Sequence, residues 1–169
     1  LINELKISEE KQTKVIRAID KLDKPGFGLK GVEDLLKKER KDQSGAVTKG
    51  ADLSDEQASR ILNFLKVKDL RELKQNLKNP LSQEGIKELE DIFEILGYGS
   101  NLNQIKTNFT IVRGLSYYSD FIVETNLNFK VTNNKGKEVD IGSICSGGAY
   151  AKLISRFRGV DVPGTGISF

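Results

Sequence analysis

The chain of 169 residues has no histidine and no methionine, and its one cysteine is Cys145. One cysteine cannot form a disulfide within the chain, and the usual zinc sites need histidine or several cysteines. Acid–base catalysis by imidazole is excluded for the same reason. We therefore predict no metal site, and we expect Cys145, which lies in an apolar run, to be an unreactive buried thiol.

Long apolar runs and a strong charge of one sign are also absent. No segment approaches the roughly 18 to 20 apolar residues that cross a bilayer, and the first residues are too charged for a signal sequence. The net charge of +3 is too small by itself to indicate nucleic-acid binding. We expect a cytoplasmic protein that does not associate with membranes. The missing methionine and the apolar end, GTGISF, favour a fragment of a longer protein.

The first part of the sequence, residues 1–99, predicts a helical domain because its apolar residues recur at helical spacing. Serines that precede acidic or amide residues mark expected helix starts at Ser8, Ser54 and Ser82. The expected ends are Pro25-Gly26, Gly50, Asn79-Pro80 and Gly97. These signals predict about five helices and a loop over residues 41–50.

The second part, residues 100–169, changes to β-branched and aromatic residues in alternation, which is typical of strands. We expect strands over 109–112, 121–131 and 138–145, the last two joined by a tight turn at residues 132–137. Gly147-Gly148 should open a short helix, and VPGTGISF resembles a further strand. The predicted fold class is α+β, with helices first and an antiparallel sheet after them.

The segment TIVRGLSYYSDFIVET contains the first candidate binding residues. Arg113 follows an expected strand and precedes a glycine, so its guanidinium is suited to a carboxylate or phosphate; a surface ion pair is the alternative. Adjacent strand residues point to opposite faces, so one of Tyr117 and Tyr118 should face a ligand while the other packs. Both tyrosines could instead be core residues.

A glycine pair provides the second group of candidates. Gly147 and Gly148 could let backbone amides approach a substrate, and Tyr150 could reach the same space from the next helix. An ordinary strand-to-helix turn is the alternative. No phosphate-binding loop of the GxxxxGK[ST] type occurs. Several cations of the helical part could meet phosphates, or could lie on a solvated mixed-charge face: Lys37, Lys38, Arg40, Lys41 and Lys49.

The order of these motifs is more informative than any one of them. RGLxYY, a β-run, a hairpin, GGxY, a helix and VPGTGISF follow one another, and this series resembles the histidyl-tRNA synthetase family of class II aminoacyl-tRNA synthetases, most closely the alphaproteobacterial type. The likeness is close over residues 105–169, and the helical part looks like the insertion of bacterial members. The resemblance implies an internal fragment: a helical insertion domain, 1–99, and part of the antiparallel sheet of a class II catalytic core, 100–169.

The resemblance also implies a function. The full-length parent would be an enzyme that activates histidine with ATP and Mg²⁺, forms histidyl-adenylate and transfers histidine to its tRNA, as a homodimer. Arg113 would contact the α-phosphate and the substrate carboxylate. Tyr118 and Tyr150 would line the imidazole pocket with Tyr117 beside them, and Gly147 and Gly148 would form its floor.

The sequence departs from the family pattern near these residues. Ser116 stands where the family usually has aspartate, and Ala149 and Ala151 replace the arginine and aspartate of GGRYD. The upstream ATP-binding and dimer motifs lie outside the chain, so we expect the fragment alone to be inactive. Two alternatives stay open: a synthetase-like regulatory protein that binds histidine without charging tRNA, and a free-standing helical RNA-binding module fused to an unrelated sheet.

Overall fold

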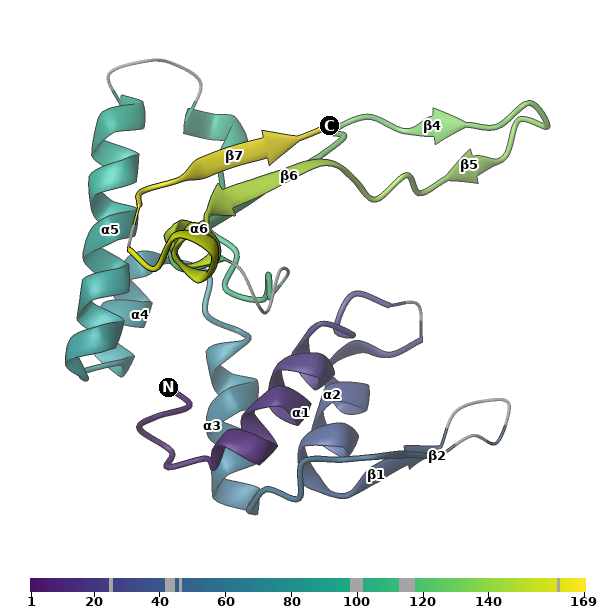
Figure 1. Ribbon diagram of the computed structural model, residues 1–169. Coiled ribbons are helices and arrows are strands. Elements are labelled where there is room, and N and C mark those ends of the chain that lie inside the picture. Colours follow the sequence, from purple (N-terminus) through teal and green to yellow (C-terminus); the bar gives the residue numbers. More distant parts are fainter. Residues whose placement is uncertain (25, 42–44, 46, 98–101, 113–117, 161) are drawn as a thin grey trace. The chain divides into compact units, whose positions relative to one another are not determined.

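The computed structural model describes residues 1–24, 26–41, 45, 47–97, 102–112, 118–160 and 162–169. The chain forms two compact units, Leu1–Arg113 and Gly114–Phe169. The first unit is mainly helical, and the second contains the sheet (Figure 1). The predicted α+β class is therefore confirmed.

Three helices form the first core of the helical unit: α1 (Glu9–Ile19), α2 (Gly28–Lys37) and α3 (Asp55–Phe64). Their apolar faces meet around side chains that are fully or almost fully buried, among them Val15, Val32, Leu36 and Ile61. A short antiparallel hairpin of β1 (Glu39–Lys41) and β2 (Val47–Lys49) follows α2. Figure 1 shows this hairpin extending from the end of α2.

Two further helices, α4 (Leu70–Asn76) and α5 (Pro80–Gly97), enclose a smaller core in the same unit. Its buried members are Val67, Leu73, Leu77 and Ile86. A 3₁₀ turn, η1 (Leu102–Gln104), follows. The segment after it returns to this unit, because the ring of Phe109 packs 6.2 Å from the ring of Phe64 at the end of α3.

The second unit is built on an antiparallel sheet of three strands in the order β3 (Ile122–Asn126), β6 (Ser143–Ala149), β7 (Thr165–Ser168). Two short strands, β4 (Val131–Thr132) and β5 (Glu138–Val139), pair with each other and extend the β3–β6 hairpin into an arm (Figure 1). Helix α6 (Ala151–Arg158) connects β6 to β7. The central strand, β6, is thus the element on which this unit is organised.

The predicted helices are confirmed in number over the described residues, but one start, one end and one loop were wrong. The expected helix end at Gly50 is wrong because residues 47–49 before it form β2, and α2 ends at Lys37. Helix α5 begins at Pro80 and not at Ser82, because the Asn79 carboxamide oxygen accepts a hydrogen bond from the Ser82 amide and so caps the first turn. The predicted loop over 41–50 contains β2 and the end of β1.

The strand predictions needed more correction. Residues 109–112 form no strand, because the Asn108 side chain accepts bonds from the amide and hydroxyl of Thr110 and holds a turn. The expected strand over 121–131 is interrupted between β3 and β4, and the expected strand over 138–145 is interrupted at Gly142, whose φ is +69°. Gly147 and Gly148 lie inside β6 and do not open the helix, which begins at Ala151.

The boundary between the compact units lies at residues 113 and 114, whereas composition changes near residue 99. Residues 102–112 belong to the helical unit by contact, since Phe109 packs on Phe64 and Val112 on the first core. The division into an insertion domain, 1–99, and a partial catalytic core, 100–169, stays a prediction. Within the described part of the chain, no helix has both the length and the apolar character needed to span a bilayer.

Candidate functional site

Tyr118 lies against a glycine of the central strand. A Cβ atom built on Gly148 would stand 2.9 Å from Cδ1 of the Tyr118 ring and 2.5 Å from the carbonyl oxygen of Phe121. A methyl carbon cannot lie so close to a ring carbon or a carbonyl oxygen, so only glycine leaves room for the tyrosine ring here. Gly148 is buried and Tyr118 is half-buried, which leaves part of the ring accessible.

Tyr150 has the same relationship with a glycine of the neighbouring strand. A Cβ atom built on Gly166 of β7 would lie 2.8 Å from the Tyr150 hydroxyl and 3.1 Å from its ring carbon Cε1. The hydroxyl donates a hydrogen bond of 2.8 Å to the carbonyl of Thr165, and the Tyr150 amide donates to the carbonyl of Gly164. Tyr150 precedes the first residue of α6, so these bonds fix the end of β6 to the start of β7.

The two tyrosine rings lie on one face of the sheet. Gly148 of β6 and Gly166 of β7 are direct partners in the antiparallel register. Side chains of directly opposed residues project to the same face of a sheet. Tyr118 fills the space of the first glycine and Tyr150 that of the second, so the rings converge over a paired glycine floor. Such a site offers aromatic faces and hydroxyl groups to a small planar ligand.

Gly147 serves a different purpose from its neighbour. Successive strand residues alternate between faces, so Gly147 and Gly148 do not project to the same side. A Cβ atom on Gly147 would overlap the carbonyl oxygen of Gly166 and stand 2.8 Å from Cα of Ile167. Gly147 therefore permits β7 to approach β6 closely, and Gly148 makes room for Tyr118.

Arg113 and Tyr117 lie outside the described residues. Cys145 is a buried free thiol, as expected. Among the described residues, no three His, Cys, Asp or Glu side chains are grouped so that they could hold a metal ion.

Sequence reasoning missed the contribution of β7. Gly164 and Gly166 both lie against the Tyr150 ring, and neither was a predicted site residue. The sequence PGTGISF contains two glycines two positions apart, and residues with this spacing in an extended chain project to the same face. That spacing was the sequence signal for the contact with Tyr150. A strand glycine often marks a close approach by another group, and here that group is an aromatic ring.

Two of the cations for which phosphate contacts and a solvated mixed-charge face were both left open form contacts within the chain. Lys37 Nζ lies 2.8 Å from Glu33 and 2.9 Å from Asp55, and these hydrogen bonds raise the pKa of the lysine. Arg40 lies 3.5 Å from Asp34 and its guanidinium stacks 4.3 Å from the centre of the Phe27 ring. Both cations are therefore engaged by partners within the helical unit.

A structural comparison gives the class of fold. A crystal structure from Bacillus halodurans, described as an ATP phosphoribosyltransferase regulatory subunit/histidyl-tRNA synthetase, superposes with a TM-score of 0.58 at 20% identity, over 90% of this chain and 34% of that one. The chain thus shares the α+β fold of a synthetase-related protein, consistent with part of a class II core. No family model matches the sequence.

Sequence comparison identifies the family more closely. The chain is 78% identical over 169 residues to the histidine–tRNA ligase of Pelagibacter ubique, covering 100% of the chain and 36% of that protein. It is 43% identical to the ligase of Bartonella quintana (94% of the chain, 33% of the relative) and 45% identical to that of Rhizobium leguminosarum (91% and 31%). The chain is therefore homologous to a region of the histidine–tRNA ligases, also called histidyl-tRNA synthetases, which confirms the sequence-based recognition. It spans about a third of the length of the curated relatives it matches.

Proposed function

We propose that the protein to which this chain contributes is a histidine–tRNA ligase, and that the second unit forms part of its amino-acid site. The histidine carboxylate would attack the α-phosphorus of ATP, forming a P–O bond and releasing pyrophosphate. The adenylate would then transfer histidine to its tRNA. The observation that carries this proposal is the convergence of Tyr118 and Tyr150 over the paired glycines of β6 and β7.

The tyrosine pair suits an imidazole substrate. A flat ring can pack between or upon aromatic side chains, and a tyrosine hydroxyl can bond a ring nitrogen. The Tyr150 hydroxyl already donates to Thr165, so it would accept from a ring N–H. Gly148 supports this by keeping the floor beneath Tyr118 free of side-chain atoms. We assign Tyr118 and Tyr150 to the imidazole pocket, with Tyr117 beside them and Gly148 in its floor. Gly147, which the resemblance also placed in the floor, faces the other side of β6 and lets β7 approach.

Arg113 is assigned to the reacting groups on its chemistry. A guanidinium can form two parallel hydrogen bonds to a carboxylate or phosphate. Negative charge develops around the α-phosphate as the carboxylate attacks, and a fixed cation stabilises that charge without reorganising. Arg113 would therefore hold the substrate carboxylate and the α-phosphate together. Mg²⁺ would arrive as the ATP complex, with no ligand assigned to it on this chain.

The proposal extends to partners. The full-length protein would bind histidine, ATP and the histidine tRNA, act as a homodimer and work in the cytoplasm. The names of the relatives, which are histidine–tRNA ligases, support the first three of these. The helical unit would belong to the insertion that lies toward the tRNA.

Histidine-dependent exchange of pyrophosphate into ATP by the full-length protein tests the proposed function. This assay follows activation alone, so it does not depend on tRNA. Exchange that requires histidine, and that the isolated 169-residue chain does not catalyse, is the expected result. Histidine binding without exchange would contradict the enzyme assignment and favour a regulatory histidine-binding protein. The Bacillus halodurans structure is described both as a regulatory subunit and as a synthetase. The assay distinguishes these two functions.

A further inference from the structure

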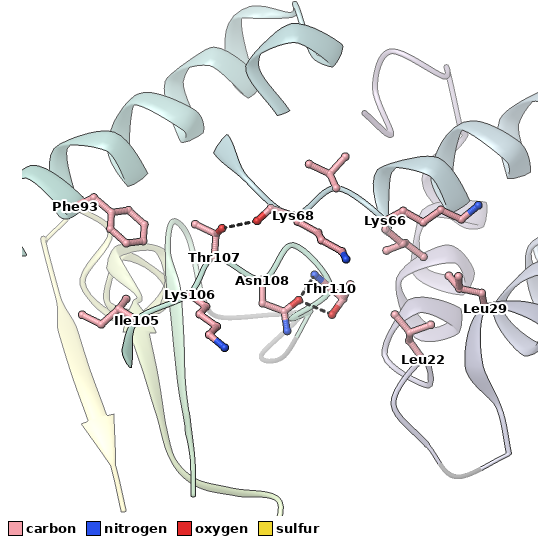
Figure 2. A pocket seen from close by; sticks show the side chains of 12 residues that line it. Leu22, Leu29, Lys66, Lys68, Phe93, Ile105, Lys106, Thr107, Asn108 and Thr110 are labelled. Carbon is pink, nitrogen blue, oxygen red and sulfur yellow. Dashed lines mark hydrogen bonds between the residues drawn. The ribbon is translucent and has the colours of Figure 1, made fainter. Parts of the chain in front are cut away.

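A hollow in the helical unit lies apart from the tyrosine site. Its volume is about 720 Å³, which falls in the range of small-molecule sites. Residues from the turn after α1, the start of α2, the segment after α3, α5 and the segment after η1 line it. Figure 2 labels ten of them. All of these segments belong to the unit Leu1–Arg113.

The charged groups of the hollow are all cations. Lys66, Lys68 and Lys106 line it and are exposed, and no described lining residue is acidic. None of the three forms an ion pair with a described residue, whereas Lys74 and Lys87 of the same unit each lie within 2.8 Å of a carboxylate. Figure 2 shows Lys68 and Lys106 extending into the space around Asn108. An anion entering here would meet uncompensated positive charge.

One carboxamide in the hollow is held in a fixed orientation. The Asn108 oxygen accepts bonds of 2.9 Å from the Thr110 amide and 2.6 Å from the Thr110 hydroxyl. Because the oxygen already accepts these two bonds, the Asn108 nitrogen, with its two hydrogens, is the group that can donate to a ligand. The Thr107 hydroxyl donates to the Lys68 carbonyl at 3.2 Å and ties the two lysine-bearing segments together.

Apolar groups complete the hollow next to these polar ones. Phe93 of α5 and Ile105, which is 39% exposed, form one end of it (Figure 2). Leu65 and Val67 are buried beneath, so the floor is fixed by the two cores. A half-buried phenylalanine ring provides a face on which a planar ring can stack.

We infer that this hollow binds a nucleoside phosphate. The base would stack on Phe93 beside Ile105, the Asn108 amide nitrogen would donate to a ring nitrogen or carbonyl of the base, and Lys68 and Lys106 would hold the phosphate. An acidic peptide would satisfy the lysines but would leave the aromatic face and the carboxamide unused. A free mononucleotide and an unpaired residue of an RNA strand present this same chemistry. The site lies outside the unit that carries the proposed histidine pocket, so it adds a function to the ligase assignment.

The test is a titration of the 169-residue chain, labelled with ¹⁵N, with adenosine monophosphate and separately with a short single-stranded RNA. We expect saturable shifts in the amide spectrum for residues 66–68, 93 and 105–110, with dissociation constants of about 1 mM or lower. Lys68→Gln/Lys106→Gln should weaken binding at least about tenfold, since each charge-assisted bond to phosphate is among the stronger hydrogen bonds. Phe93→Leu should weaken it about fivefold by removing the stacking face.

The matched control is Lys14→Gln/Lys137→Gln, which removes two exposed lysines that line no part of the hollow and form no ion pair with a described residue. It should change affinity less than about twofold, apart from general screening effects. Equal weakening by the two double variants, shifts only outside the hollow, or equal binding of a glutamate peptide would overturn the inference. Tighter binding of adenosine monophosphate would identify a free mononucleotide as the ligand, and tighter binding of the RNA would identify an unpaired RNA residue. Either result supports the site. No amino acid is activated in this titration, so a negative result would leave the ligase assignment unaffected. Likewise, a negative result in pyrophosphate exchange would leave the nucleotide site unaffected.

Discussion

The Tyr118 ring occupies the space that a side chain on Gly148 would need: Cδ1 of the ring lies 2.9 Å from the position of a Cβ atom there. The opposed residue, Gly166, has the same relationship with Tyr150. Two tyrosines and two glycines, distributed over residues 118 to 166, therefore form one local arrangement. It is the geometric basis of the proposed histidine site.

Gly148→Ala should disturb the site and destabilise the sheet unit. The added methyl group would lie 2.5 Å from the Phe121 carbonyl, which belongs to the backbone and cannot rotate away, and would also push the Tyr118 ring aside. Overpacking of this kind costs about 1 to 3 kcal/mol. In the full-length protein we expect the KM for histidine in pyrophosphate exchange to rise at least about fivefold, since about 1 kcal/mol or more of substrate contact would be lost.

The control for this variant is Gly85→Ala in α5. No atom lies within 4 Å of a Cβ at Gly85, and the residue is helical, so alanine should stabilise the helix by about 0.5 to 1 kcal/mol. Exchange kinetics should stay as in the wild type. A Gly148→Ala protein with an unchanged KM for histidine would show that Tyr118 does not contact this substrate.

Tyr150 and Gly166 should behave as a coupled pair in a double-mutant cycle. Tyr150→Phe removes the hydrogen bond to Thr165 and should cost about 1 kcal/mol. Gly166→Ala should cost more, because its methyl group would lie 2.8 Å from that hydroxyl. With the hydroxyl removed, part of the clash disappears, so the double variant should be less destabilised than the sum. Urea unfolding measures all four proteins, and strict additivity would place the ring away from the glycine.

Glu4 should make the stability of the helical unit depend on pH. Its carboxylate accepts bonds from the Asn79 side chain at 2.6 Å, the Asn79 amide at 3.1 Å and the Lys78 amide at 3.3 Å. The Asn79 side chain is the largest cause that lowers the pKa of Glu4 below its usual 4.5. A lowered folded-state pKa contributes stability above the unfolded value, and this is lost as the pH falls through the folded-state pKa.

Glu4→Gln should therefore lower the urea midpoint at pH 7 and flatten its decline below about pH 4.5, the region in which an unshifted carboxylate begins to protonate. Glu84→Gln, which changes an exposed glutamate of α5, serves as the comparison and should leave the decline as it is. If both variants keep the wild-type pH profile, the Asn79 contacts do not form in solution.

The two serines before α1 and α3 should differ in their contribution to stability. The Ser54 hydroxyl accepts from the Gln57 amide at 3.2 Å and the Gln57 side chain accepts from the Ser54 amide at 3.1 Å, which is a capping box. Ser8 makes no side-chain capping bond. Ser54→Ala should cost about 1 kcal/mol in thermal or urea unfolding, and Ser8→Ala less than about 0.5 kcal/mol. Equal costs would contradict the capping assignment.

The helical unit was largely predictable because its signals are local. Apolar spacing located α1 to α5, and the capping box at Ser54 lies within four residues of sequence. Errors arose where one polar side chain redirected the backbone. Asn79 caps α5 three residues before Ser82, and Asn108 holds a turn in a run whose alternation predicts a strand. Neither effect is visible in hydrophobic periodicity.

The candidate site was only partly predictable because it depends on register. Alternation located the strands, yet it could not show that Gly148 opposes Gly166 and so brings two tyrosines to one face. The resemblance placed Gly147 and Gly148 together in the floor of the imidazole pocket, whereas alternation along β6 places them on opposite faces of the sheet. The nucleotide hollow was not predicted at all, since Lys68, Phe93 and Lys106 come together only when the chain folds.

The most direct test of the central claim is a crystal structure of the full-length protein with histidine bound. The account predicts electron density for the imidazole on the face of β6 that carries Tyr118 and Tyr150, with a ring nitrogen within hydrogen-bond distance of one of the two hydroxyl groups. Density for histidine on the opposite face of the sheet, or no histidine near Gly148 and Gly166, would contradict it.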